Sequence, residues 1–231
     1  MITVTDALKS YNGNIVVNIP QLSIRPGEII GLVGNNGAGK TTFFRLLLDL
    51  VRIEKGEILS DGKNVANTED WKRYTAAYLD DGFLINYLTP EEYFYFVGDL
   101  NNRGKADVDE FLRGFESFFD GSILNSGKYI RDLSKGNQFK VGIAACLLQN
   151  PAVLILDEPF ANLDPSSQMR LIKMLKEMRA QREMTVFVSS HDLNHVTDVC
   201  ERILLMEKGR IIKDIESSHD TLAELESYFK V

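Results

Sequence analysis

Residues 34–42, which read Gly-Asn-Asn-Gly-Ala-Gly-Lys-Thr-Thr, constrain the fold of this chain more than any other stretch. The apolar run Ile29–Val33 before them is typical of a buried strand, and residues 43–50 after them have helical character. Three glycines allow a tight turn, and successive N–H groups at the start of a helix point at a bound anion. The order of strand, glycine-rich loop and helix therefore predicts a phosphate-binding loop.

The side chains of this loop match the parts of a nucleotide site. Lys40 supplies a mobile positive charge for the β- and γ-phosphates, and the hydroxyl of Thr41 is placed to ligate Mg²⁺. The alternative is a glycine-rich turn with a solvated lysine. A chance match to this pattern is expected only on the order of once per hundred chains of this length, so nucleotide binding is favoured. The other residues predicted to bind the nucleotide here are Asn35, Gly37, Ala38, Gly39 and Thr42.

Two adjacent carboxylates, Asp157 and Glu158, form the second part of the predicted site. They follow the continuous apolar run Val153–Leu156, which is expected of a central parallel strand covered on both faces. Buried carboxylates are costly unless they meet a cation or take part in chemistry, and the carboxyl ends of parallel strands face the ligand crevice. We therefore expect Asp157 to hold Mg²⁺ and Glu158 to orient a water. A hydrophilic turn is the alternative interpretation.

The rest of the pattern predicts an α/β protein. Short β-rich runs at residues 2–4 and 15–17 indicate antiparallel strands at the start of the chain. A hairpin across residues 203–212 and a polar helix from about Thr221 are expected near its end.

Residues 83–150 predict a helical insertion. Thr89 begins a capping box, and aromatic side chains recur after it at helical spacing. These aromatic side chains either belong to the core or line a groove for a partner helix, and the core interpretation is favoured.

Length and charge limit the remaining possibilities. A chain of 231 residues suits one domain, with a core lobe of about residues 1–82 and 151–231 and a helical lobe of about 83–150. The net charge of −7 argues against nucleic-acid binding by bulk electrostatics. No apolar run approaches the ~18 residues of a spanning helix, so a cytosolic protein is expected. Cys146 and Cys200 are expected to be buried thiols.

Two further side chains have more than one interpretation. Tyr11 is either an ordinary aromatic at a strand end or a flat surface for adenine, and the residues alone favour the ordinary one. His191 follows another predicted strand and would face the same crevice as Asp157. His191 and His195 are spaced to share a helix face, which raises a metal-site alternative, but the Glu of a zinc-protease pattern is absent between them.

Taken in order, these motifs resemble the ATP-binding subunit of an ABC transporter over about residues 11–210. The phosphate loop matches Walker A, and residues 153–158 match Walker B. Residues 133–137 stand where the family has its Leu-Ser-Gly-Gly-Gln signature, residues 161–164 match the D-loop, and His191 matches the switch histidine. The resemblance implies a P-loop NTPase core with a mainly parallel sheet, an N-terminal antiparallel β subdomain and a helical insertion.

The resemblance also implies roles. The protein would bind ATP and Mg²⁺ and drive a separate membrane permease from the inner face of the cell membrane. Two ATPase subunits, identical or different, would pack head to tail, with each ATP between one Walker A loop and the partner's Ser134 and Gly136. Glu158 would act as general base, worth roughly 10²- to 10⁴-fold in rate. Lys40 and His191 would contact the γ-phosphate, and Tyr11 would stack on adenine.

Two departures from the family pattern affect the details. The family usually places a Gln that touches Mg²⁺ after residues 76–79, where this chain has Asp80 and Asp81, and Asp81 is aligned as the metal ligand. In the signature, Lys135 and Asn137 replace a Gly and the Gln. Lys135 would add positive charge near the partner's ATP and favours export.

A soluble ABC-type ATPase acting on nucleic acid or ribosomes is the alternative to a transporter subunit. Such relatives usually carry two ATPase units or a long coiled-coil insertion, and neither is visible in this sequence. The acidic charge balance also counts against this alternative.

Overall fold

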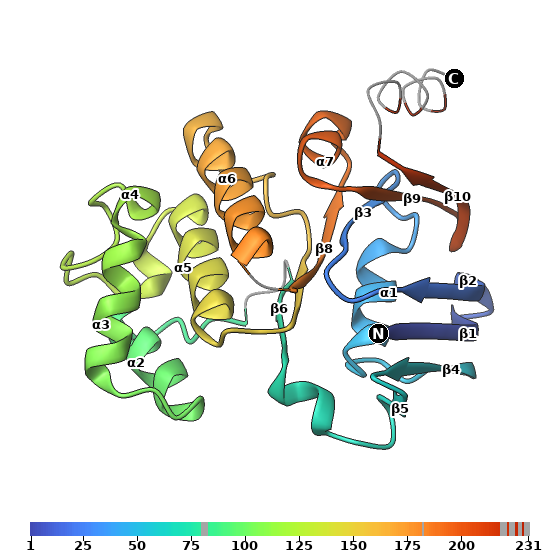
Figure 1. Cartoon of the computed structure of the whole chain (residues 1–231), viewed down its shortest axis with the longest axis horizontal. Coiled ribbons are helices and arrows are strands. Elements are labelled where there is room, and N and C mark those ends of the chain that lie inside the picture. Colours follow the sequence, from blue (N-terminus) through green and yellow to red (C-terminus); the bar gives the residue numbers. More distant parts are fainter. Residues whose placement is uncertain (80–82, 182, 218–220, 222–224, 226–227, 229–231) are drawn as a thin grey trace.

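Two β-sheets form the framework of the protein (Figure 1). The computed structural model describes residues 1–79, 83–181 and 183–217, together with Thr221, Leu225 and Tyr228. The strands of the larger sheet are β3 (Ile29–Val33), β6 (Thr75–Tyr78), β7 (Val153–Leu156), β8 (Thr185–Ser190), β9 (Arg202–Glu207) and β10 (Arg210–Glu216). Within the described chain their order is β10-β9-β3-β8-β7-β6. Neighbours from β9 to β6 run parallel and β10 runs antiparallel to β9, which confirms the α/β fold and the hairpin near the end.

The smaller sheet lies in the N-terminal part of the chain. Its strands are β1 (Ile2–Tyr11), β2 (Asn14–Ile24), β4 (Lys55–Ser60) and β5 (Lys63–Asn64), in the order β2-β1-β4-β5 and all antiparallel. β1 and β2 are longer than the short runs expected from the sequence. Asp6 has a φ of 48°, and the register of β1 against β2 shifts between Lys9 and Ser10. These irregularities interrupt the alternation of buried and exposed side chains from which a strand is predicted.

The central strands are buried because packed side chains cover both faces of the larger sheet. Every residue of β3, β7 and β8 is buried, as a parallel strand between two layers requires. Ile29 and Val33 point into one hydrophobic cluster with the helices of residues 90–148, whereas Ile30 and Leu32 point into a second cluster with the smaller sheet. β3, which leads into the phosphate-binding segment, is therefore fixed from both sides.

Helices α2 (Pro90–Leu100), α3 (Lys105–Gly114), α4 (Glu116–Phe119) and α5 (Lys135–Leu148), with the short 3₁₀ turn η2 (Ile130–Asp132), gather at one end of the molecule (Figure 1). The expected helix start at Thr89 is confirmed. Its Oγ1 accepts from the backbone N–H of Glu92 at 3.3 Å, and the Glu92 carboxylate accepts from the Thr89 N–H at 2.8 Å.

The aromatic side chains of this region differ in burial. Phe94, Phe115, Phe118 and Phe119 are buried in the core, as favoured from the sequence. Tyr93, Tyr95 and Phe111 are partly buried against that core, and Phe83, Tyr87 and Phe96 are exposed.

The remaining helices connect the strands. They are α1 (Lys40–Leu47), η1 (Asp70–Arg73), α6 (Pro165–Gln181) and α7 (Leu193–Val199). Helix α1 begins three residues before the expected start at residue 43, because Gly39 already serves as its N-cap. Thr221, Leu225 and Tyr228 are helical, and the rest of the expected terminal helix lies outside the described residues. Cys146 and Cys200 are buried and free, as expected. Among the described residues, no helix has the length and hydropathy needed to cross a bilayer.

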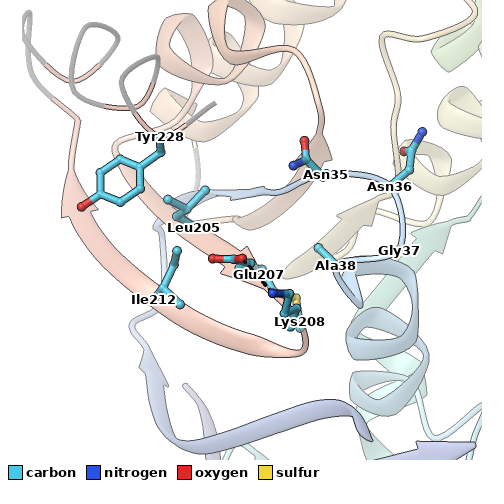
Figure 2. A pocket seen from close by; sticks show the side chains of 10 residues that line it. Asn35, Asn36, Gly37, Ala38, Leu205, Glu207, Lys208, Ile212 and Tyr228 are labelled. Carbon is cyan, nitrogen blue, oxygen red and sulfur yellow. Dashed lines mark ion pairs between the residues drawn. The ribbon is translucent and has the colours of Figure 1, made fainter. Parts of the chain in front are cut away.

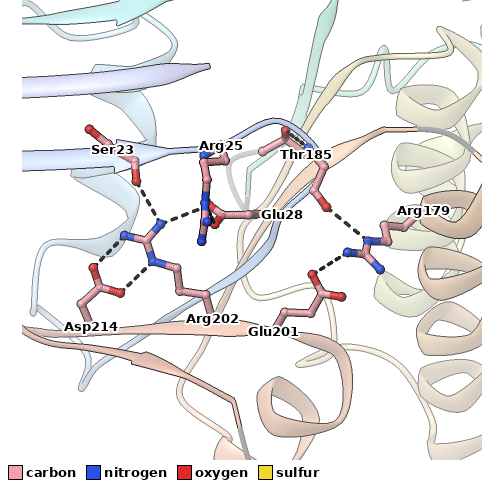
Figure 3. A network of polar contacts seen from close by, with 9 residues as sticks. Ser23, Arg25, Glu28, Arg179, Thr185, Glu201, Arg202 and Asp214 are labelled. Carbon is pink, nitrogen blue, oxygen red and sulfur yellow. Dashed lines mark hydrogen bonds and ion pairs between the residues drawn. The ribbon is translucent and has the colours of Figure 1, made fainter.

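An arginine-centred network ties the end of the chain to its beginning (Figure 3). The guanidinium of Arg202, at the start of β9, donates to both carboxylate oxygens of Asp214 on β10, each at 2.7 Å. It also donates to the carbonyl of Ser23 at 2.9 Å and to the carboxylate of Glu28 at 3.1 Å. Because Ser23 and Glu28 flank the turn between β2 and β3, the network holds the C-terminal hairpin against both sheets.

Candidate functional site

Residues 34–39 form a loop between β3 and α1, and residues 40–42 are the first turn of α1, which confirms the predicted order of strand, loop and helix. Gly37 and Gly39 have φ angles of 83° and 108°, in the left-handed region that glycine adopts without steric cost. The backbone N–H of Ala38 donates to the carbonyl of Asn35 at 3.0 Å, which closes the turn. Helix α1 begins at Lys40, so the free N–H groups of its first turn open onto the loop. The backbone therefore has the arrangement that binds phosphate.

The ammonium of Lys40 is held over this loop. Its Nζ donates to the carbonyl of Gly34 at 2.6 Å and lies 3.3 Å from Oε1 of Glu158. Lys40 is only 6% exposed. The charge that sequence analysis assigns to a phosphate is therefore fixed beside the loop and beside the carboxylate expected to act on water.

Asp157 lies directly after β7 and is buried. Its Oδ2 accepts from the hydroxyl of Thr41 at 2.6 Å, and its Oδ1 accepts from the hydroxyl of Ser189 on β8. A carboxylate beside a hydroxyl is a set of hard oxygen donors, which suits Mg²⁺ when phosphate oxygens complete the shell. The two oxygen ligands predicted from separate motifs thus meet at one point.

Glu158 adopts a φ of 50°, a left-handed conformation that costs a non-glycine residue roughly 1–2 kcal/mol. Its backbone N–H donates to the Ser189 hydroxyl at 2.8 Å. Its Oε2 lies 2.9 Å from Nδ1 of His191 and accepts from the backbone N–H of His191 at 3.3 Å. Glu158, predicted to act on the attacking water, therefore contacts both Lys40 and His191, which are predicted to contact the γ-phosphate.

A cavity of about 260 Å³ is open above the loop. It is lined by Val16, Asn36, Gly37, Ala38, Gly39, Lys40, Thr41, Thr42, Asp157 and Glu158. Walker A and Walker B residues that lie more than a hundred positions apart in the sequence thus share one hollow of polar and charged groups.

A second cavity, of about 490 Å³, borders the same loop (Figure 2). Residues 35–38 form one wall, and the β9–β10 hairpin with Tyr228 forms the other. The hairpin also touches the loop directly, because the N–H of Gly209 donates to the carbonyl of Ala38 at 2.8 Å. A Cβ added at Gly34 would lie 2.3 Å from the Met206 carbonyl, so this glycine is required by close backbone packing rather than by its φ.

Tyr11 is the last residue of β1 and is 43% exposed. The Nζ of Lys9 lies 5.0 Å from the centroid of its ring. The β1–β2 hairpin that carries Tyr11 reaches the phosphate loop, since a Cβ at Gly39 would lie 2.4 Å from the Val16 carbonyl. Among the described residues lining the phosphate cavity, this hairpin contributes Val16 rather than Tyr11.

Ser134 and Gly136 occupy the start of a helix, as expected. Ser134 is the N-cap of α5, and its hydroxyl accepts from the N–H of Asn137 at 3.2 Å. A Cβ at Gly136 would lie 2.6 Å from the Asn162 carbonyl, so the signature segment packs against the D-loop of the same chain. Neither Ser134 nor Gly136 is among the described residues that line the phosphate cavity.

His191 and His195 lie in different parts of the local fold. His191 precedes α7, whose N-cap is Asp192, so His191 and His195 do not share a helix face as the metal-site alternative requires. His191 contacts Glu158 instead, whereas Nε2 of His195 lies 3.1 Å from the Gln168 side-chain oxygen. Asp80 and Asp81 lie outside the described residues.

Sequence reasoning missed Ser189, although its hydroxyl contacts both Asp157 and the backbone of Glu158. The available signal was its place near the carboxyl end of a parallel strand, two residues before His191. Asn162 was identified as part of the D-loop, but the approach of its carbonyl to Gly136 was not predicted. This contact joins the D-loop to the first turn of α5 and has no signal in spacing or hydropathy.

The fold and this loop define a P-loop ATPase of the α/β class. The family described as "ABC transporter" matches residues 17–161 of the chain, and a description "AAA domain, putative AbiEii toxin, Type IV TA system" matches the shorter segment 127–197. A relative named "Uncharacterized ABC transporter ATP-binding protein YhcH", from Bacillus subtilis, is 32% identical and aligns with 96% of this chain and 72% of its own length.

Relatives named for export and for import both occur. The lipopolysaccharide export system ATP-binding protein LptB of Haemophilus influenzae is 32% identical, over 92% of this chain and 89% of that protein. The methionine import ATP-binding protein MetN of Caulobacter vibrioides is 29% identical, over 93% of this chain and 66% of that protein. A solved structure titled "Structure of ATP binding subunit of ABC transporter" superposes with a TM-score of 0.84 and 25% identity, covering all of this chain and 95% of its own.

The chain therefore belongs to the ABC transporter family, as one of its ATP-binding subunits, and is an ATPase. This confirms the resemblance drawn from the order of the motifs.

Proposed function

We propose that this protein hydrolyses ATP at the phosphate cavity to drive a membrane permease that is a separate polypeptide. The observation that carries the proposal is the meeting of Lys40, Thr41, Asp157 and Glu158 around one cavity. A lysine for the phosphates, two oxygen ligands for a cation and a carboxylate for the attacking water are the parts that ATP hydrolysis needs.

Each side chain has a part in the proposed reaction. Lys40 and the N–H groups at the start of α1 hold the β- and γ-phosphates, and Asn35, Gly37, Ala38, Gly39 and Thr42 complete the cradle. Glu158 takes a proton from the attacking water, and His191 holds the Glu158 carboxylate in place and reaches the γ-phosphate. Tyr11 supplies a flat face for adenine.

We propose that Thr41 and Asp157 bind Mg²⁺ together with ATP. The hydroxyl and carboxylate oxygens lie side by side at the edge of the cavity, which fits the donor set. When bound, Mg²⁺ would neutralise charge on the phosphate oxygens during transfer. Asp81, the third predicted ligand, stays a prediction.

We propose that two ATPase subunits, identical or different, complete each site. Ser134 and Gly136 start a helix whose N–H groups can receive an anion, yet in this chain they do not line the described part of the phosphate cavity. A partner subunit that presents the same segment would supply them from the opposite side. Exposed Lys135 would then add positive charge beside the nucleotide.

The permease is proposed to dock on an apolar surface beside the loop between β6 and α2. A cavity of about 170 Å³ is lined by Leu48, Leu50, Trp71, Ala77, Leu79 and Phe83. Leu50 and Phe83 are half exposed, and Ile85 and Tyr87, which follow Phe83 in the sequence, are exposed as well. Exposed apolar patches of this kind mark interaction surfaces. Phe83, which lines this cavity, is one of the aromatic side chains for which the sequence raised a groove for a partner helix as the alternative.

Three broader parts of the proposal follow from the sequence. The chain acts as one domain, with a core lobe of about residues 1–82 and 151–231 and a helical lobe of about 83–150. It works in the cytoplasm on the inner face of the cell membrane and binds no nucleic acid. The proposed direction is export, supported by Lys135, and transport assays in vesicles with the permease would decide it.

The test uses Glu158→Gln, which keeps the shape of the side chain and removes the proton acceptor. This variant is expected to bind ATP, to lose turnover by at least about a hundredfold, and to form a dimer in size-exclusion chromatography only when ATP is present. Glu177→Gln, which makes the same change on an exposed part of α6, is the control. A variant that hydrolyses ATP at the wild-type rate would remove Glu158 from the reaction, and one that stays a monomer with ATP would contradict the two-subunit site.

A further inference from the structure

A group of charged side chains lies behind Tyr11, outside the phosphate cavity. The Nζ of Lys9 is 5.0 Å from the centroid of the Tyr11 ring and 3.5 Å from Oε1 of Glu54. The side chain of Lys9 is only 14% exposed, whereas an ordinary surface lysine is solvated. Lys9 is thus packed between an aromatic face and a carboxylate, at cation–π distance from the ring.

Glu54 is itself fixed by several bonds. Its two carboxylate oxygens accept from the backbone N–H of Ser10 at 3.1 Å and from the Ser10 hydroxyl at 2.8 Å. Its own N–H donates to the carbonyl of Leu8 at 3.0 Å. The hydrogen bonds from Ser10, followed by the charge of Lys9, hold the pKa of Glu54 below its ordinary value. Hydrogen bonds with Leu8 and Ser10 therefore hold Glu54 and its carboxylate on β1, on either side of Lys9. We call Glu54 the anchor of Lys9.

This anchor lies at an irregularity of the hairpin. Lys9 pairs with Val17 and Ser10 with Ile15, so Val16 is an extra residue on β2. Such bulges bend a strand and redirect side chains near functional sites. The carbonyl of Val16 is directed at Gly39 of the phosphate loop, so the same bulge sets where the hairpin, and Tyr11 at its end, stands relative to the phosphates.

We propose that Lys9 and Glu54 are positioning residues for the nucleotide base. Glu54 holds the Lys9 ammonium against one face of the Tyr11 ring, and the ring offers its other face to adenine. This inference rests on the proposed binding of ATP at the phosphate loop and deepens it. The alternative is a plain ion pair between a lysine and a glutamate, which would affect neither the base nor the phosphates specifically.

The test separates the base from the phosphates. Wild type and Lys9→Met are titrated with ATP and with inorganic triphosphate, which has no base, both in the presence of Mg²⁺. Lys9→Met is expected to weaken ATP binding about twofold to fivefold, the size of a cation–π contact with a partly exposed ring, and to leave triphosphate binding unchanged. In hydrolysis the KM for ATP should rise by the same factor at constant kcat.

Companion variants locate the effect. Lys9→Met should change nothing further in a Tyr11→Ala background, because Lys9 acts through the ring. Lys9→Arg, which keeps a cation able to stack on Tyr11, should restore ATP binding. Glu54→Gln should weaken ATP binding without affecting triphosphate. Lys63→Met, which breaks an exposed ion pair between Lys63 on β5 and Asp70 on η1, should alter the binding of neither ligand.

Two results would overturn the proposal: equal losses for ATP and triphosphate in Lys9→Met, or a Lys9→Met effect that persists when Tyr11 is already Ala. A different pattern would mark failure of the proposed nucleotide site itself. If wild type bound neither ligand, or if Lys40→Ala bound triphosphate at wild-type strength, the proposed phosphate site would be contradicted. The proposed positioning role of Lys9 and Glu54, which depends on that site, would then be contradicted too.

Discussion

The ammonium nitrogen of Lys40 lies 3.3 Å from Oε1 of Glu158, inside the cavity that the phosphate loop encloses. A triphosphate in this loop competes with Glu158 for the same cation. Two substitutions should therefore change ATP affinity in opposite directions. Lys40→Ala should weaken binding about tenfold or more, since a charge-assisted hydrogen bond is worth roughly 1.5–3 kcal/mol. Glu158→Gln should strengthen it about threefold, because the pair is partly exposed and worth roughly 1 kcal/mol at most.

Titration with a fluorescent ATP analogue measures both effects, at protein concentrations low enough to keep the chain monomeric. Lys208→Ala is the control for Lys40, because Lys208 is an exposed cation on the wall of the neighbouring cavity. If Lys208→Ala weakened binding as much as Lys40→Ala, general charge around the loop would account for the affinity. Weaker binding by Glu158→Gln would contradict the competition.

The sequence predicted the site wherever the chemistry lies in consecutive residues. The phosphate loop and Asp157 with Glu158 each follow an apolar run, and hydropathy alone places such runs in a buried sheet. Contacts between segments that are distant in the sequence could not be predicted from it. Ser189 meets Asp157 only because β7 and β8 pair in the register that sets Leu156 beside Val188, and no pattern in one strand reveals its register against another.

The same reasoning explains why the sequence left the setting of Tyr11 and the start of the helix after His191 undetermined. The bulge at Val16 and the bend at Asp6 disturb strand alternation, so β1 and β2 were expected to be shorter and the setting of Tyr11 could not be derived. The spacing of His191 and His195 fits one face of a helix. The Asp192 side chain caps the helix one residue later, and capping decides where a helix starts more strictly than spacing does.

Ser189→Ala should lower both stability and turnover. The hydroxyl is fully buried, donates to Asp157 and accepts from the N–H of Glu158. Its loss leaves two buried polar groups each short of a partner, which costs roughly 1–3 kcal/mol. It also releases the left-handed backbone of Glu158, so kcat should fall. Urea unfolding and a phosphate-release assay measure the two effects.

Ser60→Ala is the matched control, since Ser60 is also buried and its hydroxyl bonds to that of Tyr74, at 3.0 Å, away from the site. It should cost stability and leave turnover unchanged. Wild-type kcat in Ser189→Ala would show that Glu158 keeps its position without this hydroxyl.

Arg202→Met should destabilise the protein at pH 7, by about 1–3 kcal/mol, because Glu28 and Asp214 lose their shared partner. Burial alone would raise the pKa of Glu28. Hydrogen bonds from Arg25 and the charges of Arg202 and Arg25 outweigh burial and hold this pKa below its ordinary value of 4.5. A carboxyl with a lowered folded-state pKa stabilises the fold above its unfolded-state pKa, and this stabilisation is lost as pH falls through the folded-state value.

The difference in unfolding free energy between wild type and Arg202→Met should therefore be full at pH 7 and shrink below about pH 4.5. Urea unfolding across that range measures it. Arg179→Met is the control, because Arg179 is more exposed than Arg202 and, within the described part of the chain, pairs with one carboxylate, that of Glu201, at 2.8 Å. The effect of Arg179→Met should be smaller. A difference that stayed constant down to pH 3 would mean that Glu28 gains nothing from Arg202.

Gly34 and Gly37 lie three residues apart in the phosphate loop. Substitution by alanine should destabilise the protein at both positions, but for different physical reasons. A Cβ at Gly37 meets nothing within 4 Å, but its φ of 83° is costly for alanine, so Gly37→Ala should lose roughly 1–2 kcal/mol through backbone strain alone. A Cβ at Gly34 would lie 2.3 Å from the Met206 carbonyl. No rotamer change relieves a clash with backbone, so Gly34→Ala must push the β9–β10 hairpin away from the loop.

Hydrogen exchange at Gly209 distinguishes the two mechanisms, because its N–H donates to the carbonyl of Ala38 across this contact. The Gly209 amide should keep its protection factor in Gly37→Ala. In Gly34→Ala its protection factor should fall by at least about tenfold, because opening of the hairpin becomes easier by roughly 1.4 kcal/mol or more. Equal protection in the two variants would show that the hairpin does not support the phosphate loop. The two glycines would then share one role, as a reading of the motif alone assumes.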